Sequence, residues 1–506
     1  MRDFLFKYQW VLILVVAAIG GFLCMDSGHE WGDDFGLYLH QAQCWVDGGM
    51  DLLAAENKDC MDTSDGLLGP YLYPQGFPLF LSFFIRLFGL LGLKGLPLLL
   101  ALKMANFVVF LLILTVFLKL INIKFEGNRN KILLAFVLIA WHPKIWEAAD
   151  RLSSDLWFTG LVILFFYGLN VEFKAGWTKI LTLSLLVLVA TATRSNGIFL
   201  VAAWVIQEFL VWRKFGKSEG LVPAFLLGGL AGFLALSADA GNGSNHWVLL
   251  REIRFETIVD HLGVYFQMAG TYPFWHFATA MKLFPWAVGF VWLGALFFWI
   301  LVVWGAMKSG PKWMGAVVFL VLNLSLYVVW PSVQGMRFLF PLLPLLVIFL
   351  VQGMDGFWKK FLPVLTTVWN GMPAGVASVK NWVWGIVILV LVQGVMTSVF
   401  YTNLDTNQAY SKPVRELYDF VLQSVKPEER VSFHKPRLMH YVTGAKVYRI
   451  AQDPKDHADA VARLQVKGVD YWILEKHMWT SGRGVPVYSL NKVFENQQFV
   501  VYRIGR

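Results

Sequence analysis

The sequence has little charge for its length. Of its 506 residues, 15% are Asp, Glu, Lys or Arg and 57% are hydrophobic, whereas soluble proteins keep about a quarter of their residues charged. This deficit excludes an ordinary soluble protein and predicts an all-α polytopic membrane protein. The net charge of +9 does not indicate nucleic-acid binding, because Lys and Arg concentrated in cytoplasmic loops give the same total.

Cysteine is also scarce, with three in the chain. Their spacing fits no metal motif. Cys44 and Cys60 fall in one loop, and if that loop is extracytoplasmic a disulfide and two separate thiols are both compatible with the sequence. A small-residue cleavage site is missing after the apolar run 11–25. We therefore expect Arg2 and Lys7 to precede a retained signal anchor.

Long apolar runs are abundant by contrast. We predict that residues 1–402 form a transmembrane domain of about 11 to 13 helices, because each run approaches the length that the hydrocarbon core requires. The runs cover 8–25, 96–121, 132–148, 155–171, 178–193, 197–212, 221–238, 285–307, 313–330, 338–353 and 381–401.

Lys and Arg gather at alternate ends of these runs, as the positive-inside rule requires of cytoplasmic loops. The pattern holds throughout if the short run 77–91, which contains Arg86, is re-entrant or interfacial. If that run crossed the membrane, the basic loops would change side partway along the chain. We therefore predict a cytoplasmic N-terminus, an extracytoplasmic C-terminus and outer loops at 26–95 and 239–284.

Charges return near residue 403, and we expect 403–506 to form a small extracytoplasmic α/β domain. Its pattern predicts helices over 412–425 and 456–466 and short strands at 430–433, 469–474 and 499–503. The segment Lys435-Pro436-Arg437 is expected to be a solvated turn. Contact of this segment with an acceptor or a lipid headgroup is the alternative.

Two adjacent carboxylates, Asp33 and Asp34, follow the first apolar run. Tyr38 and Ala42 come four and eight residues after Asp34, so on a helix the three residues share one face. Carboxylates at a membrane boundary are costly unless they are solvated or paired, which makes them candidate functional residues. The alternative is a solvated loop that ends one helix and caps the next.

Further ionisable residues are predicted on the same outer side. Asp155 follows two serines and is a candidate for helix capping, for catalysis or for acceptor binding. Arg194 and Arg337 go against the positive-inside pattern, so each needs an anionic partner such as a lipid headgroup, a phosphate or Asp155. His261 and Lys282 lie in the second outer loop and are candidates for ligand contact or for plain surface positions.

One reaction fits this set of residues. Transfer of a sugar from a polyprenyl phosphate releases a phosphate, which needs charge neutralisation rather than a proton. The acceptor hydroxyl needs a general base, and one carboxylate can supply it. The lipid tail of the donor keeps the site at the membrane edge. Attack opposite the leaving group inverts the anomeric carbon and requires no second carboxylic acid.

Several short motifs follow one another along residues 1–400. They are the acid pair with Tyr38 and Ala42, Tyr-Pro-x-Gly-x-Pro at 73–78, Ser-Asp at 154–155, Thr-Arg-Ser-Asn-Gly at 193–197 and Arg-Phe-Leu-Phe-Pro-Leu-Leu-Pro at 337–344. Their order resembles the GT-C membrane glycosyltransferases. The nearest groups are those related to protein O-mannosyltransferases and to the bacterial aminoarabinose transferase that modifies lipid A.

The resemblance implies roles for individual residues. Asp33 or Asp34 is then the catalytic base or the acceptor-binding group, and Asp155 belongs to the second acidic motif. Where the aminoarabinose enzymes have Lys before Pro-Pro, this chain has Tyr73-Pro74-Gln75, so the donor phosphate falls to other basic residues. The implied substrate-binding residues are Tyr38, Tyr73, Arg86, Arg194, His261, Lys282 and Arg337.

The resemblance also implies an activity and a location. We expect transfer of a hexosyl or pentosyl group from a polyprenyl-phosphate-linked donor to a hydroxyl of a glycan, lipid or protein. The place is the outer face of the bacterial inner membrane, and membrane lipids are the other expected partners. The resemblance implies no required cofactor, although some relatives hold a divalent metal near this site.

Two other functions stay open. A transporter or flippase of a lipid-linked glycan places ionisable groups and broken helices near the membrane midplane and often has internal repeats, which the two halves of this sequence do not show. A polymerase or ligase of surface glycans is also a membrane transferase and shares the features above. The sequence identifies neither the sugar nor the acceptor.

Overall fold

A computed structural model describes residues 2–65, 68, 70–216, 220–241, 254–281, 284–368, 379–401, 408–450, 457–476 and 490–505. These residues group into two compact units. Unit 1 contains the described residues within Met1–Met25, Lys103–Ala238 and Asn245–Leu404, and unit 2 those within Asp26–Leu102, Asp239–Ser244 and Asp405–Arg506. The predicted domain boundary at residue 402 stays a prediction.

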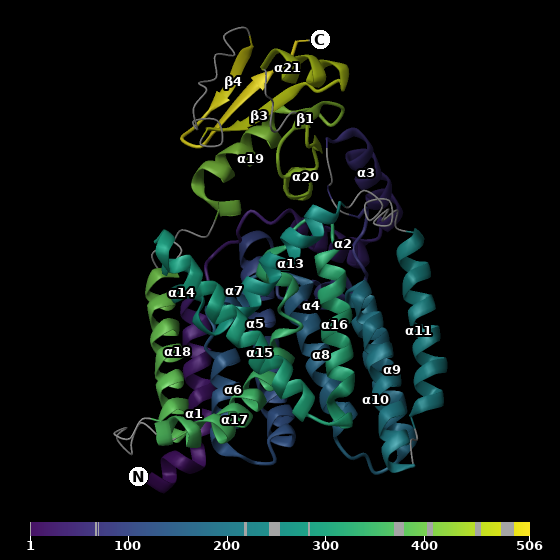
Figure 1. Cartoon of the computed structure of the whole chain (residues 1–506). Helices are drawn as coiled ribbons and strands as arrows, with labels where there is room; N and C mark the ends of the chain where they lie inside the picture. The colour runs from purple at the N-terminus through teal and green to yellow at the C-terminus, as the bar shows by residue number, and fades with distance from the viewer. Residues whose placement is uncertain are drawn as a thin grey trace. The chain divides into compact units, whose positions relative to one another are not determined.

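Unit 1 is helical, and several of its helices run side by side in Figure 1. Its α-helices are α1 (Arg2–Leu23), α5 (Gly95–Lys124, in unit 1 from Lys103), α6 (Arg129–Ala140), α7 (Pro143–Asp150), α8 (Ser154–Asn170), α9 (Gly176–Thr193), α10 (Phe199–Phe215), α11 (Leu221–Gly241), α13 (Phe255–Gly270), α14 (Trp275–Met281), α15 (Val288–Lys308), α16 (Met314–Val328), α17 (Leu343–Val368) and α18 (Val379–Tyr401). Its 3-10 helices are η1 (Ser195–Ile198), η2 (Tyr272–Phe274), η3 (Pro285–Ala287), η4 (Pro311–Trp313) and η5 (Gly335–Phe338).

Five helical segments in the described part of the chain are long and apolar enough to cross a membrane. They are Gly95–Lys124, Gly176–Thr193, Ser195–Phe215, Val288–Lys308 and Pro311–Val328. The pair α6 and α7 passes the same criterion with a bend of 50°. The chain is thus a multi-pass membrane protein, as its composition predicts, while the count of 11 to 13 spans stays a prediction.

The bend between α6 and α7 has a local cause. Pro143 takes the first position of α7, where its missing N–H is not needed, and His142 caps α7 by accepting from the Lys144 amide at 3.2 Å. The other ring nitrogen of His142 donates to the Tyr272 carbonyl at 2.6 Å. The apolar run 132–148 is therefore two helices joined at a cap.

The buried centre of unit 1 is the first half of α17, where every side chain from Leu345 to Val351 is at most 5% exposed. α15 packs along α17 at close range, because a Cβ atom on Gly305 would lie 1.8 Å from the Phe349 carbonyl oxygen. A small residue at this crossing lets the two backbones approach, as is common between helices in membranes.

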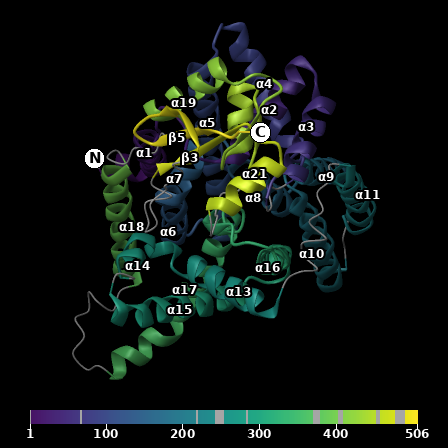
Figure 2. The ribbon, with the colours of Figure 1, turned by 90° about the horizontal axis from the view of Figure 1, so that it is seen from above.

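Unit 2 combines helices that follow the first apolar run with the C-terminal segment. Its helices are α2 (Asp33–Asp47), α3 (Met50–Thr63), α4 (Gly76–Leu90), η6 (Gln408–Tyr410), α19 (Lys412–Ser424), α20 (Pro436–Thr443) and α21 (His457–Val466). α2 packs against both α4 and α20, and Figure 2 shows α2 and α4 side by side. α4 has 15 residues. Its predicted re-entrant or interfacial character stays a prediction.

The sheet of unit 2 has five described strands in the order β2-β1-β3-β5-β4. They are β1 (Arg430–Ser432), β2 (Lys446–Tyr448), β3 (Tyr471–Glu475), β4 (Asn491–Glu495) and β5 (Phe499–Arg503). β1 pairs in parallel with β2 and β3, whereas β5 is antiparallel to β3 and β4. All five residues of β3 are buried, because successive side chains point to opposite faces and both faces are covered.

The two faces of β3 belong to different hydrophobic clusters. Tyr471 and Ile473 pack with α19, whereas Trp472 and Leu474 pack with α21. The helices and strands predicted at 412–425, 430–433, 456–466, 469–474 and 499–503 are confirmed to within two residues. The predicted solvated turn at 435–437 is wrong, because Pro436 begins α20 and Arg437 is only 4% exposed.

Cys44 and Cys60 are not joined. Cys44 lies on α2 and Cys60 on α3, and the structure contains no disulfide between them. The Cys60 thiol instead donates to the Val447 carbonyl of β2 at 3.2 Å. The α3 face that bears Cys60 thus packs on the sheet, which excludes the disulfide alternative in this structure.

Candidate functional site

Asp34 lies in the first turn of α2 and receives a short hydrogen bond. The Tyr73 hydroxyl donates to Asp34 Oδ1 at 2.6 Å. Tyr38 and Ala42, one and two turns further on, are buried, so the helix face predicted from the four-residue spacing is present. Hydrogen bonds to an ionised acceptor are shorter and stronger than neutral ones, and this bond therefore fixes the orientation of the carboxylate.

Gln41 holds the backbone of Tyr73 from the same helix. Its Nε2 donates to the Tyr73 carbonyl at 3.0 Å, and its Oε1 accepts from the Tyr73 amide at 2.9 Å. The side chain is fully buried. Gln41 is not among the predicted site residues, although it lies seven residues after Asp34 and therefore on the same helical face.

Tyr73 is enclosed by aromatic and charged groups. Its ring lies 4.5 Å from the ring of Tyr38, and the Arg437 guanidinium lies 5.8 Å from the ring centroid. Burial, and then the negative charge of Asp34, raise the pKa of Tyr73 well above its usual value near 10. Tyr73 is therefore a hydrogen-bond donor to Asp34 at every physiological pH.

Unit 1 contains a second acidic site, at Asp155 in the first turn of α8. Asp155 is 2% exposed and forms ion pairs with Arg194, the C-cap residue of α9, and with Arg337 in η5. The Arg337 Nε atom lies 3.5 Å from Asp155 Oδ2. The predicted alternative in which Asp155 is the partner of both arginines is thus confirmed, and Ser153, at the N-cap position of α8, makes no side-chain capping bond.

Polar side chains also bond to one another in the 3-10 turn after Arg194. The Asn196 amide donates to Asn323 Oδ1 at 2.6 Å and to the Tyr327 hydroxyl at 3.1 Å. The Arg194 guanidinium lies 5.3 Å from the ring centroid of Phe338. This network joins η1, α16 and η5, so the Thr-Arg-Ser-Asn-Gly and Arg-Phe-Leu-Phe motifs meet within unit 1.

A further buried ion pair in unit 1 was not predicted. Lys103 on α5 is fully buried, and its Nζ lies 2.7 Å from Asp150 Oδ1 at the end of α7. Asn106 donates to the carbonyls of Ala149 and Arg151 at 2.8 and 3.0 Å. These contacts secure the link between α7 and α8 that leads to Asp155.

The remaining predicted site residues have other surroundings. Arg86 is exposed and donates to the Trp45 carbonyl near the end of α2 at 2.9 Å. His261 is 7% exposed, and its Nδ1 donates to the Val328 carbonyl at 3.2 Å. Lys282 and the side chain of Asp33 lie outside the described residues. The predicted convergence of Asp34 with Asp155 and Arg194 stays a prediction, since Asp34 belongs to unit 2 and the other two to unit 1.

Metal binding finds no support in the described part of the chain. Among those residues, no three His, Cys, Asp or Glu side chains are placed to hold an ion together. The divalent metal that the family resemblance allows therefore has no set of three described ligands.

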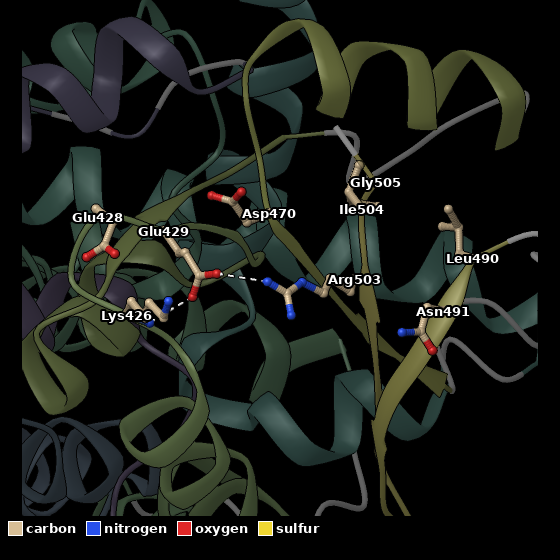
Figure 3. Close-up of a pocket in the computed structure, with 9 residues that line it drawn as sticks. All are labelled: Lys426, Glu428, Glu429, Asp470, Leu490, Asn491, Arg503, Ile504 and Gly505. Atoms are coloured by element: carbon tan, nitrogen blue, oxygen red, sulfur yellow. Dashed lines mark hydrogen bonds and ion pairs between the residues drawn. The ribbon is translucent and has the colours of Figure 1, made fainter.

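Unit 2 also contains a pocket of about 610 Å³ at one end of the sheet (Figure 3). Two of its acidic side chains, those of Glu429 and Asp470, have local partners. Glu429 pairs with Arg503 at 3.3 Å and accepts from the Lys426 amide at 2.8 Å, and Asp470 accepts from the Arg430 amide at 2.9 Å. These bonds close the loops that precede β1 and β3, and we assign the pocket no role in the site.

Comparison with known proteins identifies the fold. No family profile matches the chain, and no curated protein matches its sequence. The crystal structure of ArnT from Cupriavidus metallidurans bound to undecaprenyl phosphate aligns with a TM-score of 0.56 and 14% identity, over 98% of this chain and 98% of that chain. The archaeal oligosaccharyltransferase AglB from Archaeoglobus fulgidus, in complex with an inhibitory peptide and a dolichol-phosphate, aligns with a TM-score of 0.52 and 11% identity, over 94% of this chain and 70% of that chain. The GT-C fold predicted from the motif order is thereby confirmed.

Proposed function

We propose that the protein is a membrane glycosyltransferase that moves a sugar from a polyprenyl-phosphate-linked donor to a hydroxyl acceptor. The single observation that supports this most is the fold match with ArnT, because it extends over 98% of both chains and that structure holds undecaprenyl phosphate. The acid predicted in the first outer loop agrees with this fold, since Asp34 lies in the first turn of α2 with a hydrogen-bonded carboxylate.

In this proposal Asp34 is the general base. Its carboxylate accepts the proton of the acceptor hydroxyl while the acceptor oxygen forms a bond to the anomeric carbon. The bond from that carbon to the phosphate oxygen breaks, and the polyprenyl phosphate leaves with the electron pair. The attack is opposite the leaving group and inverts the anomeric configuration. Tyr73 orients the base and does not exchange its own proton.

Arg194 and Arg337 are proposed to neutralise the donor phosphate. Asp155 balances one of the two guanidinium charges, so the three side chains together retain one positive charge. Guanidinium groups match phosphate oxygens in a bidentate geometry. Because the Asp155 carboxylate is ion-paired with both arginines, we propose that it positions them and does not act as a second base.

The outer face of an inner membrane is the proposed location, with the N-terminus cytoplasmic. The motif order and the loop charges support it. The sugar and the acceptor are left to experiment, and a polymerase or ligase of surface glycans is included in the proposal as a transferase of the same chemistry.

The test is mass spectrometry of lipid-linked sugars and envelope glycans from cells with the wild-type chain, with no chain, or with Asp34→Asn or Asp33→Asn. We expect the lipid-linked donor to accumulate, and one sugar to disappear from the glycans, without the chain and with Asp34→Asn. Identical lipid and glycan profiles with and without the chain would refute the transferase. Wild-type profiles in both Asn variants would refute only the base assignment.

A further inference from the structure

We propose that Arg437 of α20 is a positioning residue for Asp34, acting through Tyr73, so that the C-terminal segment belongs to the acid-base site. The inference rests on the proposed function, because it assigns Arg437 to the base of that reaction. All the residues involved lie in unit 2.

Tyr73 lies between two opposite charges. Its hydroxyl bonds Asp34 at 2.6 Å, and the Arg437 guanidinium lies 5.8 Å from its ring centroid. A cation near an aromatic face is attracted to the ring. Tyr73 therefore has its ring held by Arg437, its backbone held by Gln41 and its hydroxyl directed at the carboxylate.

Arg437 is itself held in place by burial and by a hydrogen bond. The side chain is 4% exposed, and its Nη2 donates to the Pro70 carbonyl at 2.6 Å. Burial of a guanidinium is costly unless it is paired or hydrogen-bonded. Pro70 lies three residues before Tyr73, so one arginine holds both the loop and the ring that the loop presents.

α20 and α2 are in direct contact. A Cβ atom on Gly36 would lie 2.9 Å from the Cα atom of Leu438, so the two backbones are in direct contact. Gly36 is two residues from Asp34, and Leu438 follows Arg437. A displacement of α20 would therefore change the distance of Arg437 from the Tyr73-Asp34 pair.

The position of Arg437 has an electrostatic effect as well as a geometric one. Arg437 is always charged and favours the ionised form of a nearby carboxylate. The described titratable and charged groups with contacts in this region include Asp34, Tyr38, His40, Tyr73, Arg437, His440 and Tyr441, and Glu56 of α3 lies 3.2 Å from His440. His40 and His440 face one another, and Arg437 is the permanently charged cation among these named groups.

Unit 2 offers a matched control with the same chemistry. Arg430 lies 5.3 Å from the ring centroid of Tyr448, whose hydroxyl donates to Asp59 Oδ2 at 2.5 Å. The Arg430 guanidinium also donates to a carbonyl, that of Lys467, at 3.0 Å. The Arg430 set therefore repeats the arrangement of Arg437, Tyr73 and Asp34 around a carboxylate to which the proposed function gives no role.

The experiment compares full-length wild type, Arg437→Met, Arg437→Lys and Arg430→Met in nanodiscs. Infrared difference spectra follow the protonation of Asp34 through the carboxyl band that Asp34→Asn removes, and turnover assays with the donor pool give the pH profile. With Arg437→Met, we expect the Asp34 titration midpoint and the acid limb of the profile to rise by on the order of one pH unit. We also expect kcat at neutral pH to fall on the order of tenfold, with KM for the donor nearly unchanged.

Arg437→Lys, which keeps the charge, is expected to recover most of the shift in midpoint, and Arg430→Met to leave the midpoint and the profile unchanged. An Asp34 midpoint in Arg437→Met equal to that of wild type would overturn the inference, even if both Met variants lower the melting temperature. A Lys variant that titrates like the Met variant would contradict it as well. A wild type without transferase activity would refute the proposed function, while a shifted midpoint in Arg437→Met would still support the positioning of Asp34.

Discussion

Asp155 is the residue whose surroundings differ most from those of a surface carboxylate. It is nearly fully buried, and two arginines from separate helical turns, Arg194 and Arg337, converge on it. Removal of one partner from a buried ion pair leaves uncompensated charge and is strongly destabilising. We therefore propose that Asp155 stabilises unit 1 whatever reaction the arginines serve.

Asp155→Asn is expected to lower the free energy of unfolding by about 2–4 kcal/mol, because two guanidiniums would then face each other without a carboxylate between them. The matched control is Asp355→Asn on α17, whose partners Lys131 and Lys359 lie at 2.9 and 3.0 Å but are more accessible. The control is expected to cost less than about 1 kcal/mol. Thermal unfolding of both variants in detergent measures the difference, and equal melting temperatures would contradict the account.

Some single residues are predictable from the sequence and others are not. Arg194 is recognisable in the sequence because it goes against the charge pattern of the loops. Its partner Asp155 is one of the anionic partners expected for it. Arg437 had no such signal, since Lys-Pro-Arg reads locally as a solvated turn. Its burial depends on Pro70, 367 residues earlier in the chain, and a contact of that range leaves no trace in local pattern.

At the scale of elements, the contact of α2 with α20 depends on the absence of a side chain at Gly36. Gly36→Ala is expected to destabilise unit 2 by about 1–3 kcal/mol, because the new Cβ meets backbone that cannot rotate away. Gly89→Ala on α4 is the control, since a Cβ there meets nothing within 4 Å. Denaturant unfolding or limited proteolysis compares them, and a Gly36→Ala variant as stable as the control would show that the two helices do not pack this closely.

The same helix contact contains a titratable pair. Burial, and then the neighbouring His440, lower the pKa of His40 to about 4. The unfolded chain takes up a proton near pH 6.5, whereas the folded chain takes it up only near pH 4. Acidification across this window therefore favours the unfolded state, by up to about 3 kcal/mol at its lower end.

His40→Gln is expected to reduce the loss of stability between pH 6.5 and 4. The groups that face His40 are Tyr441 and His440 of α20, and Glu56 lies 3.2 Å from His440. Melting temperatures of wild type and variant across this range provide the measurement. Parallel curves for the two proteins would show that His40 is not responsible.

Helices were predictable as elements because hydrophobicity is a local property. Each apolar run of the sequence contains at least part of a described α-helix, and the run 132–148 contains parts of two, α6 and α7, which are separated just before Pro143. The short elements were harder. β4 (Asn491–Glu495) has no buried residue, and β2 has three residues, so neither shows the alternation that marks a strand. α20 was missed because its eight residues include the apparent turn.

At the scale of the whole molecule, the chain order and the structural units do not coincide. The segment after the first apolar run and the C-terminal segment form one unit, joined by bonds such as that of Arg437 to Pro70. Both segments are predicted on the same outer side, but no local pattern indicates that they join, because each segment separately has the pattern of a loop or a small domain.

The proposed orientation has its own test. A reporter that is active only outside the cytoplasm, such as alkaline phosphatase, is expected to be active when fused after the C-terminal domain. The same reporter is expected to be inactive when it is inserted in the loop 125–128, because that loop lies among basic residues. The opposite pattern of activity would contradict the predicted topology.

The most direct test of the central claim is the release of polyprenyl phosphate by the purified protein. Wild type and Asp34→Asn in nanodiscs receive the lipid-linked sugars extracted from cells that accumulate them, together with the envelope acceptor fraction, and mass spectrometry follows the lipids over time. We predict that wild type converts the sugar-linked lipid to free polyprenyl phosphate while Asp34→Asn does not. Equal conversion by the two proteins, or none by wild type, would contradict the account.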